Sequence, residues 1–204
     1  MRAYLLAHPE VLRETAAKLD AKDMADDAAA RRRAEVELPK SRAAIEHDPA
    51  DFVANPTGRV TVTEFYDYRC PHCVEAAPQI VAMIHDRRDV RFVFKEMPIF
   101  GPTSEHAARA ALAVKAAGGD YLGLYQDFMG ARGLDDSAID RLALARGARA
   151  ADLADAREQN AHLAATRALF DRLNLGGTPA FIVGDHIISG ANFPAILAAI
   201  SATR

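Results

Sequence analysis

The chain contains two cysteines, Cys70 and Cys73, which are separated by Pro71 and His72 in the motif CPHC. Such a pair could form a structural crosslink, supply half of a metal site, or carry out thiol chemistry. A crosslink this short constrains little of the unfolded chain, so it adds little stability. A structural zinc site needs further ligands, and the remaining candidates are scattered histidines: His8, His47, His85, His106, His162 and His186. The spacing therefore favours a reactive dithiol, and we expect neither a bound metal nor another cofactor.

The elements predicted around this motif place Cys70 between a strand and a helix. Residues 60–66 (VTVTEFY) are typical of a buried strand, and a helical pattern begins at Pro71. Alternating apolar residues over positions 90–94 indicate a second strand. A strand, a helix and a second strand at this spacing predict a parallel βαβ unit.

The junction of a strand and a helix N-terminus is a favourable place for a thiolate. Free backbone N–H groups and the helix dipole both stabilise negative charge there, which would favour the ionised form of Cys70. Pro71 keeps the first turn rigid, and His72 can stabilise the sulfur further when it is protonated or donates a hydrogen bond. Cys73 lies one turn later and points inward. We therefore expect Cys70 to form a mixed disulfide with another protein and Cys73 to resolve it.

The rest of the chain predicts an α/β fold with a helical insertion. Residues 101–173 show four helical patterns. Two short apolar runs follow, divided by Gly184 and Asp185, which is typical of a hairpin, and residues 191–200 close the chain as a helix. Thr178 and Pro179 stand at the start of the first hairpin strand, where proline is tolerated. An ordinary trans peptide is the commoner state of such a bond.

The first 55 residues differ from the rest and predict a helical arm. Leucine or another apolar residue recurs every seven positions in two sets, which are Leu5, Leu12 and Leu19, then Leu38, Ile45 and Phe52. The sets are out of register, and the second set is broken at Pro39, directly after Leu38. So thin an apolar stripe fits either packing on a partner helix or an exposed arm on a monomer.

Composition excludes some classes of partner. The net charge of −3 and the pI near 6.2 give no electrostatic footprint for nucleic acid. No apolar run reaches the roughly 18 residues of a membrane span, so we expect no membrane insertion. The opening residues do not form a secretory signal, so the protein is either cytosolic or its leader is missing from this sequence.

Several motifs in the right order resemble the thioredoxin superfamily, within it the DsbA-like branch of bacterial envelope disulfide proteins. They are VTEFYDY, CPHC and GTPAFIVG. The resemblance implies a thioredoxin fold over residues 56–204, with an inserted helical subdomain at about 101–173 and a separate arm over 1–55. It also implies that Pro179 is cis beside the dithiol and that the backbone of Thr178 pairs with a client peptide. Glu64 would correspond to a buried acid that assists proton transfer at the resolving cysteine.

A narrower resemblance is to the suppressor-of-copper-sensitivity protein C (ScsC) group. It is based on YLLAHPEVL near the N-terminus and KEMPIFGP after the second strand. Some members are trimers through their N-terminal helices and are isomerases. The resemblance implies a periplasmic enzyme whose partners are unfolded or misoxidised client proteins, a membrane redox partner and further copies of itself. CPHC is familiar from oxidases and Thr178 is more typical of isomerases, so the direction stays open.

Other interpretations compete with this one. Two thiolates also suit Cu(I), so a copper-binding protein of the cell envelope is the main alternative. A peptide-binding adaptor without turnover is a further alternative. Glu64 could instead face solvent on an edge strand. If it is buried, Lys95 on the adjacent strand is the expected partner, because a buried carboxylate needs one.

Overall fold

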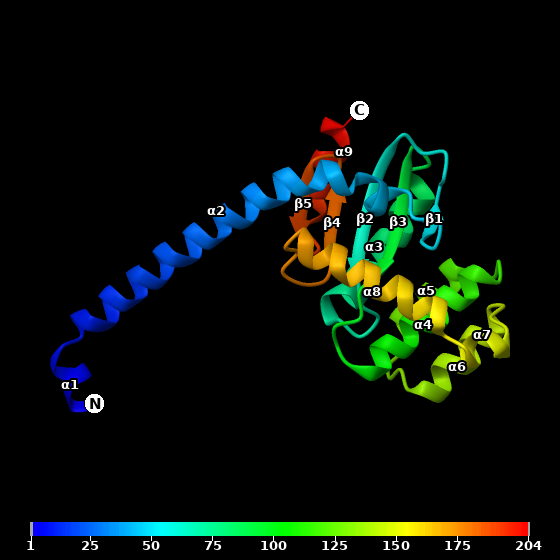
Figure 1. Ribbon diagram of the computed structural model, residues 1–204, viewed down its shortest axis with the longest axis horizontal. Coiled ribbons are helices and arrows are strands. Elements are labelled where there is room, and N and C mark those ends of the chain that lie inside the picture. Colours follow the sequence, from blue (N-terminus) through cyan, green and yellow to red (C-terminus); the bar gives the residue numbers. More distant parts are fainter. Residues whose placement is uncertain (1, 204) are drawn as a thin grey trace.

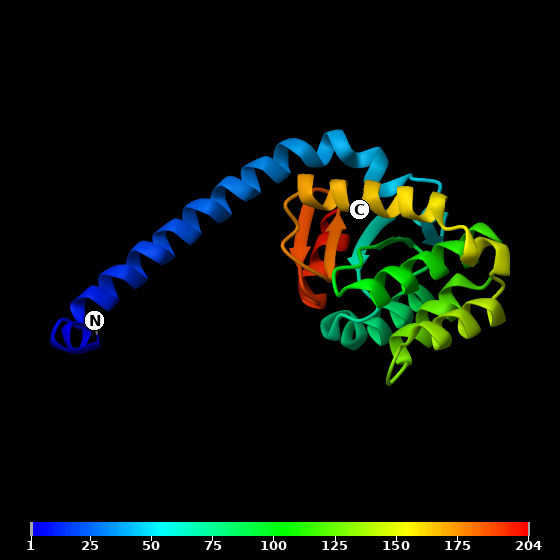
Figure 2. The same ribbon diagram turned by 60° about the horizontal axis from the view of Figure 1, so that its bottom comes forward.

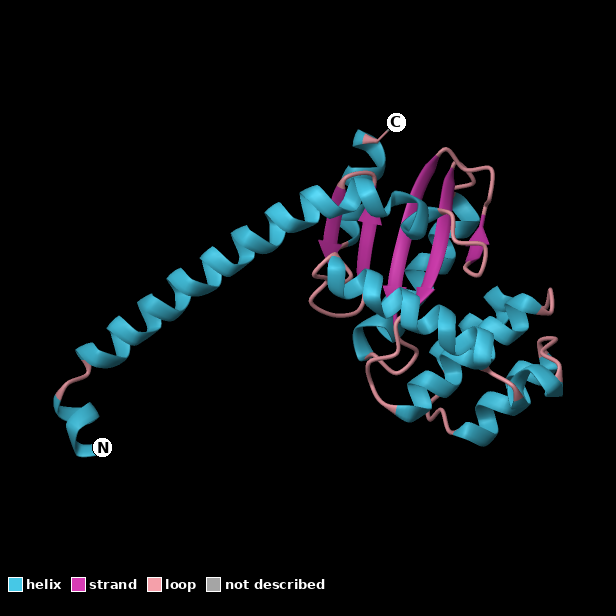
Figure 3. Cartoon of the chain, in the orientation of Figure 1, coloured by secondary structure: helices cyan, strands magenta, loops and turns pink. Residues whose placement is uncertain are grey.

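A mixed β-sheet forms the centre of the protein, whose computed structural model describes residues 2–203, without the side chains of 2–3, 23–28, 30–31 and 35. Within this range the strand order is β1-β3-β2-β4-β5. The strands are β1 (Phe52–Ala54), β2 (Val60–Tyr66), β3 (Val90–Glu96), β4 (Ala180–Val183) and β5 (His186–Ser189). Figure 3 shows them side by side, with helices on both faces. The architecture is the predicted thioredoxin fold.

The predicted βαβ unit and hairpin are both confirmed. β2 and β3 are parallel and are joined by α3 (Pro71–Asp86). β4 and β5 are antiparallel around Gly184, whose φ of 55° lies in the left-handed region that glycine adopts without strain. The segment closes with α9 (Phe193–Ala202), which begins at an Asn192 side chain that accepts a hydrogen bond from the N–H of Ala195.

Strand β1 lies in a segment that was predicted to belong to the arm. It pairs antiparallel with β3, and Phe52 lies opposite Phe94. The Phe52 ring also stacks on Tyr121 at a centroid distance of 4.3 Å. A strand of three residues is too short to show alternation, so the sequence pattern did not reveal it. The sheet therefore begins before residue 56.

The helical insertion contains five described helices where four were predicted. They are α4 (Pro102–Ala116), α5 (Tyr121–Gly130), α6 (Asp136–Ala145), α7 (Ala150–Ala154) and α8 (Arg157–Arg172). The last predicted helix is divided at residues 155–156 into α7 and α8. Aspartates accept backbone hydrogen bonds at two helix starts, Asp120 from Gly123 and Asp135 from Ala138. Figure 2 shows α8 and the end of α2 on one side of the sheet.

The N-terminal residues form α1 (Arg2–Ala7) and the 37-residue helix α2 (Glu10–Glu46). Figure 1 shows that most of α2 projects away from the globular body. Leu12 and Leu19 in the projecting part are more than half exposed. Leu38 and Ile45, by contrast, are buried in an apolar cluster with Phe65 and residues of α8. Leu38 and Ile45 of the second heptad set thus pack on the protein's own sheet.

Pro39 does not interrupt α2, contrary to the expectation that it separates two helical segments. Its side chain is exposed. The final turns are fixed by polar contacts as well. The Arg42 guanidinium donates to the carbonyl of Gly184 at 2.6 Å and to Asp185 at 2.5 Å. The last part of α2 is therefore joined to the β4–β5 hairpin.

Candidate active site

Cys70 is the N-cap residue of α3, as the motif predicted. Its backbone is extended, with φ −72° and ψ 119°, and its carbonyl accepts the first helical hydrogen bond from Val74 at 3.0 Å. Pro71 occupies the first helical position, where the missing N–H leaves no helical bond unmade. The sulfur therefore lies at the positive end of a 16-residue helix.

The Thr178–Pro179 peptide is cis and lies beside this sulfur, as the resemblance implied. The Cys70 thiol donates to the carbonyl oxygen of Thr178 at 3.2 Å, across 108 positions of sequence. Pro179 is buried, and its carbonyl accepts from the N–H of Gly190 at 2.8 Å. Because β4 pairs with β2, the fold brings these distant motifs to one end of the sheet.

The two cysteines are both unbridged thiols, and they differ in their surroundings. Cys73 is completely buried, and burial together with the negative charge of Glu64 raises the pKa of its thiol well above the ordinary value. His72 is exposed on the first turn of α3, as is Pro71. Cys73 therefore needs a proton acceptor before it can act as a nucleophile.

Glu64 is the candidate for this proton acceptor. It is 2% exposed, and it lies on β2, the central strand, which excludes the solvent-facing edge position considered above. Neither carboxyl oxygen has a hydrogen-bond partner among the described residues. Burial raises the pKa of Glu64 to about 8. The group can thus take up or release a proton near neutral pH beside Cys73.

The predicted pair between Glu64 and Lys95 is wrong. In the parallel register Glu64 lies opposite Phe94, and Lys95 lies opposite Phe65. Since side chains alternate along a strand, Lys95 points to the other face of the sheet. There its ammonium group donates to Asp51, and His162 contacts the same carboxylate at 3.0 Å. The buried lysine belongs to a separate ionic cluster.

Asp67 fixes the loop that carries the dithiol. One carboxylate oxygen accepts from the N–H of Arg69 at 2.7 Å. The other accepts from the N–H groups of Ile99 and Phe100 at 2.6 and 3.0 Å. The side chains of Ile99 and Phe100 are 39% and 46% exposed, so this contact presents apolar surface close to Cys70.

A second buried acid, Glu96, lies at the end of a chain of tyrosine hydroxyls. Tyr121 donates to Glu96, and the Tyr66 hydroxyl lies 2.7 Å from that of Tyr121 and 2.9 Å from that of Tyr68. Burial raises the pKa of Glu96 to about 7, against the opposing effect of the Tyr121 hydrogen bond. We call Tyr66, Tyr68 and Tyr121 the hydroxyl chain. Sequence reasoning missed it, because its members come from strand β2, the loop after β2 and the distant helix α5.

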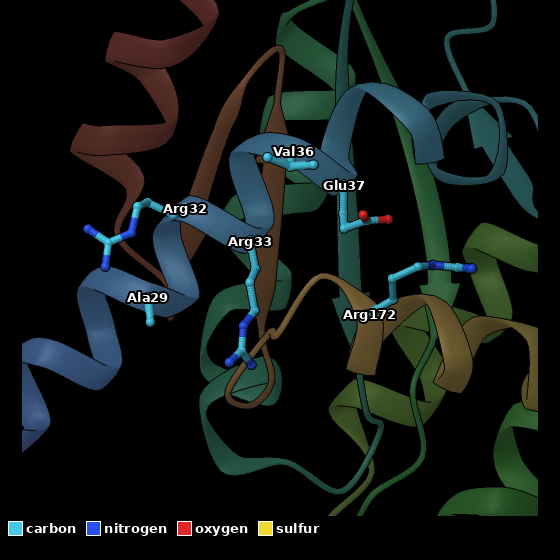
Figure 4. A pocket seen from close by; sticks show the side chains of 6 residues that line it. All are labelled: Ala29, Arg32, Arg33, Val36, Glu37 and Arg172. Atoms are coloured by element: carbon cyan, nitrogen blue, oxygen red, sulfur yellow. The ribbon is translucent and has the colours of Figure 1, made fainter.

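A surface hollow of about 480 Å³ lies apart from the dithiol, where α2 leaves the globular body. It is lined by Ala29, Arg32, Arg33, Val36, Glu37 and Arg172. Figure 4 shows that the three arginines point in different directions, so their guanidinium groups do not converge on one ligand. Among the side chains that the structure describes, no three or more His, Cys, Asp or Glu residues form a metal-binding group.

None of the described helices is both long and apolar enough to span a bilayer.

Comparison with family models and curated proteins identifies the domain type. The family model described as DsbA-like thioredoxin domain matches residues 61–200, and that described as copper resistance protein ScsC N-terminal domain matches residues 1–25. The chain is 32% identical over 149 residues to the Na(+)/H(+) antiporter NhaA 3 of Salinispora tropica. That match covers 69% of the chain and spans only 22% of the length of this relative.

Solved structures extend the likeness to nearly the whole chain. A thioredoxin-like oxidoreductase from Silicibacter pomeroyi is 34% identical with a TM-score of 0.73, covering 80% of this chain and 97% of that one. A periplasmic thioredoxin-like protein from Salmonella enterica serovar Typhimurium is 28% identical, with a TM-score of 0.72 and coverages of 79% and 94%. Proteus mirabilis ScsC in a transitional conformation is 25% identical, with a TM-score of 0.72 and coverages of 99% and 92%.

Proposed function

We propose that this chain, which belongs to the DsbA-like thioredoxin domain family, exchanges disulfides with the cysteines of other proteins. The observation that carries the proposal is the placement of Cys70. Its sulfur is at the N-terminus of α3 and bonds to the carbonyl before the cis proline. The positive end of a helix favours negative charge on an attacking sulfur, and the adjoining backbone of Thr178 offers an edge to an extended client.

The exchange requires two sulfur transfers. Cys70 attacks a client disulfide, so that one client sulfur leaves as a thiolate and the other becomes bonded to Cys70. Cys73 then gives its proton to the Glu64 carboxylate and attacks Cys70. The bond between Cys70 and the client breaks, and the second client sulfur leaves with the electron pair. The same steps in reverse oxidise a client dithiol, with Glu64 returning the proton to Cys73.

We assign isomerisation, or exchange in both directions, rather than oxidation alone. Thr178 before the cis proline and the N-terminal arm both support this direction. The arm supports assembly too, because Leu12 and Leu19 are 56% and 57% exposed on a helix that projects from the body. A trimer through these helices would hold several dithiols around one client. A membrane redox partner would then reset the dithiol.

The location that fits these clients is the periplasm. Disulfides persist in oxidising compartments, whereas cytosolic thiols are kept reduced. The likeness to a periplasmic thioredoxin-like protein supports the same location.

The direct test uses trapping. In Cys73→Ser the client should remain attached to Cys70 as a mixed disulfide, visible on a non-reducing gel with scrambled ribonuclease as the client. Cys70→Ser is the matched control and should trap nothing. Wild-type protein should reactivate scrambled ribonuclease. Absence of trapping in Cys73→Ser would exclude disulfide exchange.

The contribution of the arm is best tested by substitution. Removing residues 1–55 would delete the buried Leu38 and Ile45 and the strand β1, so it would damage the body itself. Leu12→Glu with Leu19→Glu leaves the core intact. We expect this variant to lose the trimer in sedimentation and to lose isomerisation while it keeps disulfide reduction. A wild-type protein that sediments as a monomer would contradict the assembly.

Binding of Cu(I) is a second candidate function. The match of residues 1–25 to the ScsC N-terminal model favours it, and two neighbouring thiols suit a soft two-coordinate ion. The described residues add no third thiol. A chelator competition should then show one Cu(I) per chain, lost in Cys70→Ser and in Cys73→Ser. Retention of Cu(I) in both variants would exclude this site.

A further inference from the structure

A groove on the surface runs between helices α3 and α5 and has a volume of about 350 Å³. We call it the α3–α5 groove. One side of α3 and the C-terminal half of α5 line it, and the lining residues are Val74, Ala77, Pro78, Val81, Gln126, Met129 and Gly130. None of these residues is charged, and Gln126 alone among them has a polar side chain. The sulfur transfers proposed above make no use of this surface.

The groove begins one helical turn from Cys70. The N–H of Val74 donates to the carbonyl of Cys70 at 3.0 Å, so Val74 follows Cys70 on the same side of the helix. Ala77 and Val81 continue this side, because residues three, four and seven positions apart share a helix face. Side chains of a helix lean toward its N-terminus, so the Val74 side chain leans toward the dithiol. The groove is therefore continuous with the surface around the reactive sulfur.

The groove has an apolar floor and an apolar rim. Ala77 and Met129 are 4% and 5% exposed and form the floor. Val74 is 38% exposed, and Pro78 is also exposed at the rim. Pockets that bind small molecules have volumes of about 300–1,000 Å³, so this groove is at the lower end of that range. Its size and its open side suit the side chains of a peptide segment.

We propose that the α3–α5 groove binds apolar side chains of an unfolded client segment whose cysteine is bonded to Cys70. The inference rests on the proposed disulfide exchange and adds the class of client. A client joined to Cys70 is held next to the groove, so its contact there is intramolecular and occurs at high effective concentration.

The chemistry of the lining favours such a segment. Cysteines are among the most buried residues of folded proteins, and the positions that share their buried face are apolar as well. An unfolded client therefore exposes apolar side chains close to its cysteine. A charged side chain in the groove would lose water and find no opposite charge among the lining residues.

The length of the groove sets the spacing in the client. At about 1.5 Å per residue, helix α3 rises roughly 6 Å from Cys70 to Val74 and roughly 16 Å from Cys70 to Val81. An extended peptide advances about 3.3 Å per residue. The groove should therefore select apolar side chains that lie about two to five positions from the client cysteine.

An exchange equilibrium on the full chain measures this selection. Cys73→Ser is prepared with glutathione bonded to Cys70 and is mixed with a peptide that has one cysteine. The peptide sulfur forms a disulfide with Cys70, the bond to glutathione breaks, and the thiol proton passes from the peptide to glutathione. Leucine peptides, substituted two to five positions from the cysteine, should give an equilibrium constant about tenfold above that of serine peptides. Exchange of the same peptides with glutathione disulfide corrects for the reactivity of the peptide thiol.

Two glutamine variants test where the preference arises. Gln126→Glu places a charge in the groove, and it should reduce the preference for leucine to less than about twofold. Gln79→Glu makes the same change on α3 outside the groove, and it should leave the preference unchanged. Both side chains are exposed, so both variants should fold, and thermal melts check this. Val74→Ser removes apolar surface without adding a charge and should reduce the preference about threefold.

A photoreactive peptide locates the contact directly. Benzoylphenylalanine four positions from the peptide cysteine should label Val81 or Met129 after irradiation of the mixed disulfide, as identified by mass spectrometry. Labelling of Ile99 or Phe100 instead would overturn the proposal, because the client would then lie on the other exposed apolar surface near Cys70.

The remaining outcomes are distinct. Equal equilibrium constants for leucine and serine peptides overturn the groove and leave disulfide exchange intact. An equal effect of Gln79→Glu and Gln126→Glu also overturns it. If Gln126→Glu changes the sedimentation of the peptide-free protein, the groove binds a second copy of the chain, and the proposal is wrong. Absence of a mixed disulfide with every peptide and with glutathione overturns the proposed function itself.

Discussion

Glu64 and Lys95 lie on adjacent strands, are equally buried, and have opposite surroundings. Lys95 is 1% exposed and pairs with Asp51, whose carboxylate also contacts His162. Glu64 is 2% exposed and has no hydrogen-bond partner among the described residues. The difference of one residue in register places them on opposite faces of the same sheet.

The comparison separates two uses of a buried charge. An ion pair that is fully partnered holds elements together, here the loop before β1, strand β3 and helix α8. An acid without a partner is costly when ionised, so it keeps its proton to higher pH and becomes a proton donor and acceptor near neutrality. The first kind supports the fold, and the second kind fits the proton transfer that we propose for Cys73.

The largest expected effect is on the partnered side. Asp51→Ala leaves the Lys95 ammonium buried without a counter-charge, which should lower the free energy of unfolding by about 3–5 kcal/mol. Urea denaturation at neutral pH measures it. The double variant Asp51→Leu with Lys95→Met should recover most of the loss, because no charge remains buried. A loss below about 1 kcal/mol in the single variant would show that another group compensates the charge of Lys95.

A smaller effect of opposite sign is expected for Glu64→Gln. The pKa of Glu64 is 4.5 in the unfolded chain, and burial raises it to about 8 in the folded protein. Its protonated form therefore favours the fold at low pH, and that contribution is lost as pH rises from 4.5 to 8. At pH 8 the variant should be more stable than the wild type by up to about 4 kcal/mol, with little difference near pH 4. Equal stability curves at the two pH values would contradict the buried, unpaired acid.

The smallest effect concerns His162. Burial opposes its charged form, but the hydrogen bond to Asp51 and the charges of Glu96, Asp51 and Asp48 outweigh burial and raise its pKa. Its stabilising contribution is complete below the ordinary pKa of 6.5 and is lost as pH rises through the folded value.

The variant that tests this contribution is His162→Gln. It should cost about 1 kcal/mol at low pH and less above neutrality, measured by urea denaturation at both. His106→Gln, at the more exposed pair with Asp140, is the matched control and should cost less than about 0.5 kcal/mol. An equal loss of stability for the two variants would show that the buried pair of His162 contributes no more than the exposed pair of His106.

Much of the site could be predicted because its signals are local. The βαβ order, the CPHC spacing and the hairpin each depend on patterns within a few residues, and all lie where they were predicted. The pairing of Lys95 failed because neighbouring strands share a register, and one step along a strand reverses the face. Tyr121 and Glu96 are far apart in sequence and meet only once the sheet and α5 have packed together.

The second heptad set was misleading for a physical reason. Leu38 and Ile45 recur at the spacing of a coiled coil, and the same spacing also suits one face of a helix lying on a sheet. Periodicity reports which side of a helix is apolar and says nothing of what covers that side. Here the cover is a domain of the same chain, with Phe65 and Leu169 in the same cluster.

The C-terminal end of α2 attaches the long N-terminal helix rigidly to the domain. Leu38 and Ile45 are buried in the domain, and Arg42 donates a hydrogen bond to the hairpin turn. These contacts fix the orientation of the 37-residue helix at its C-terminal end. At about 1.5 Å per residue it spans roughly 55 Å. A partner bound at the N-terminal end of α2 is therefore held in a fixed direction from Cys70. Only a bend within α2 could change the angle between the helix and the domain.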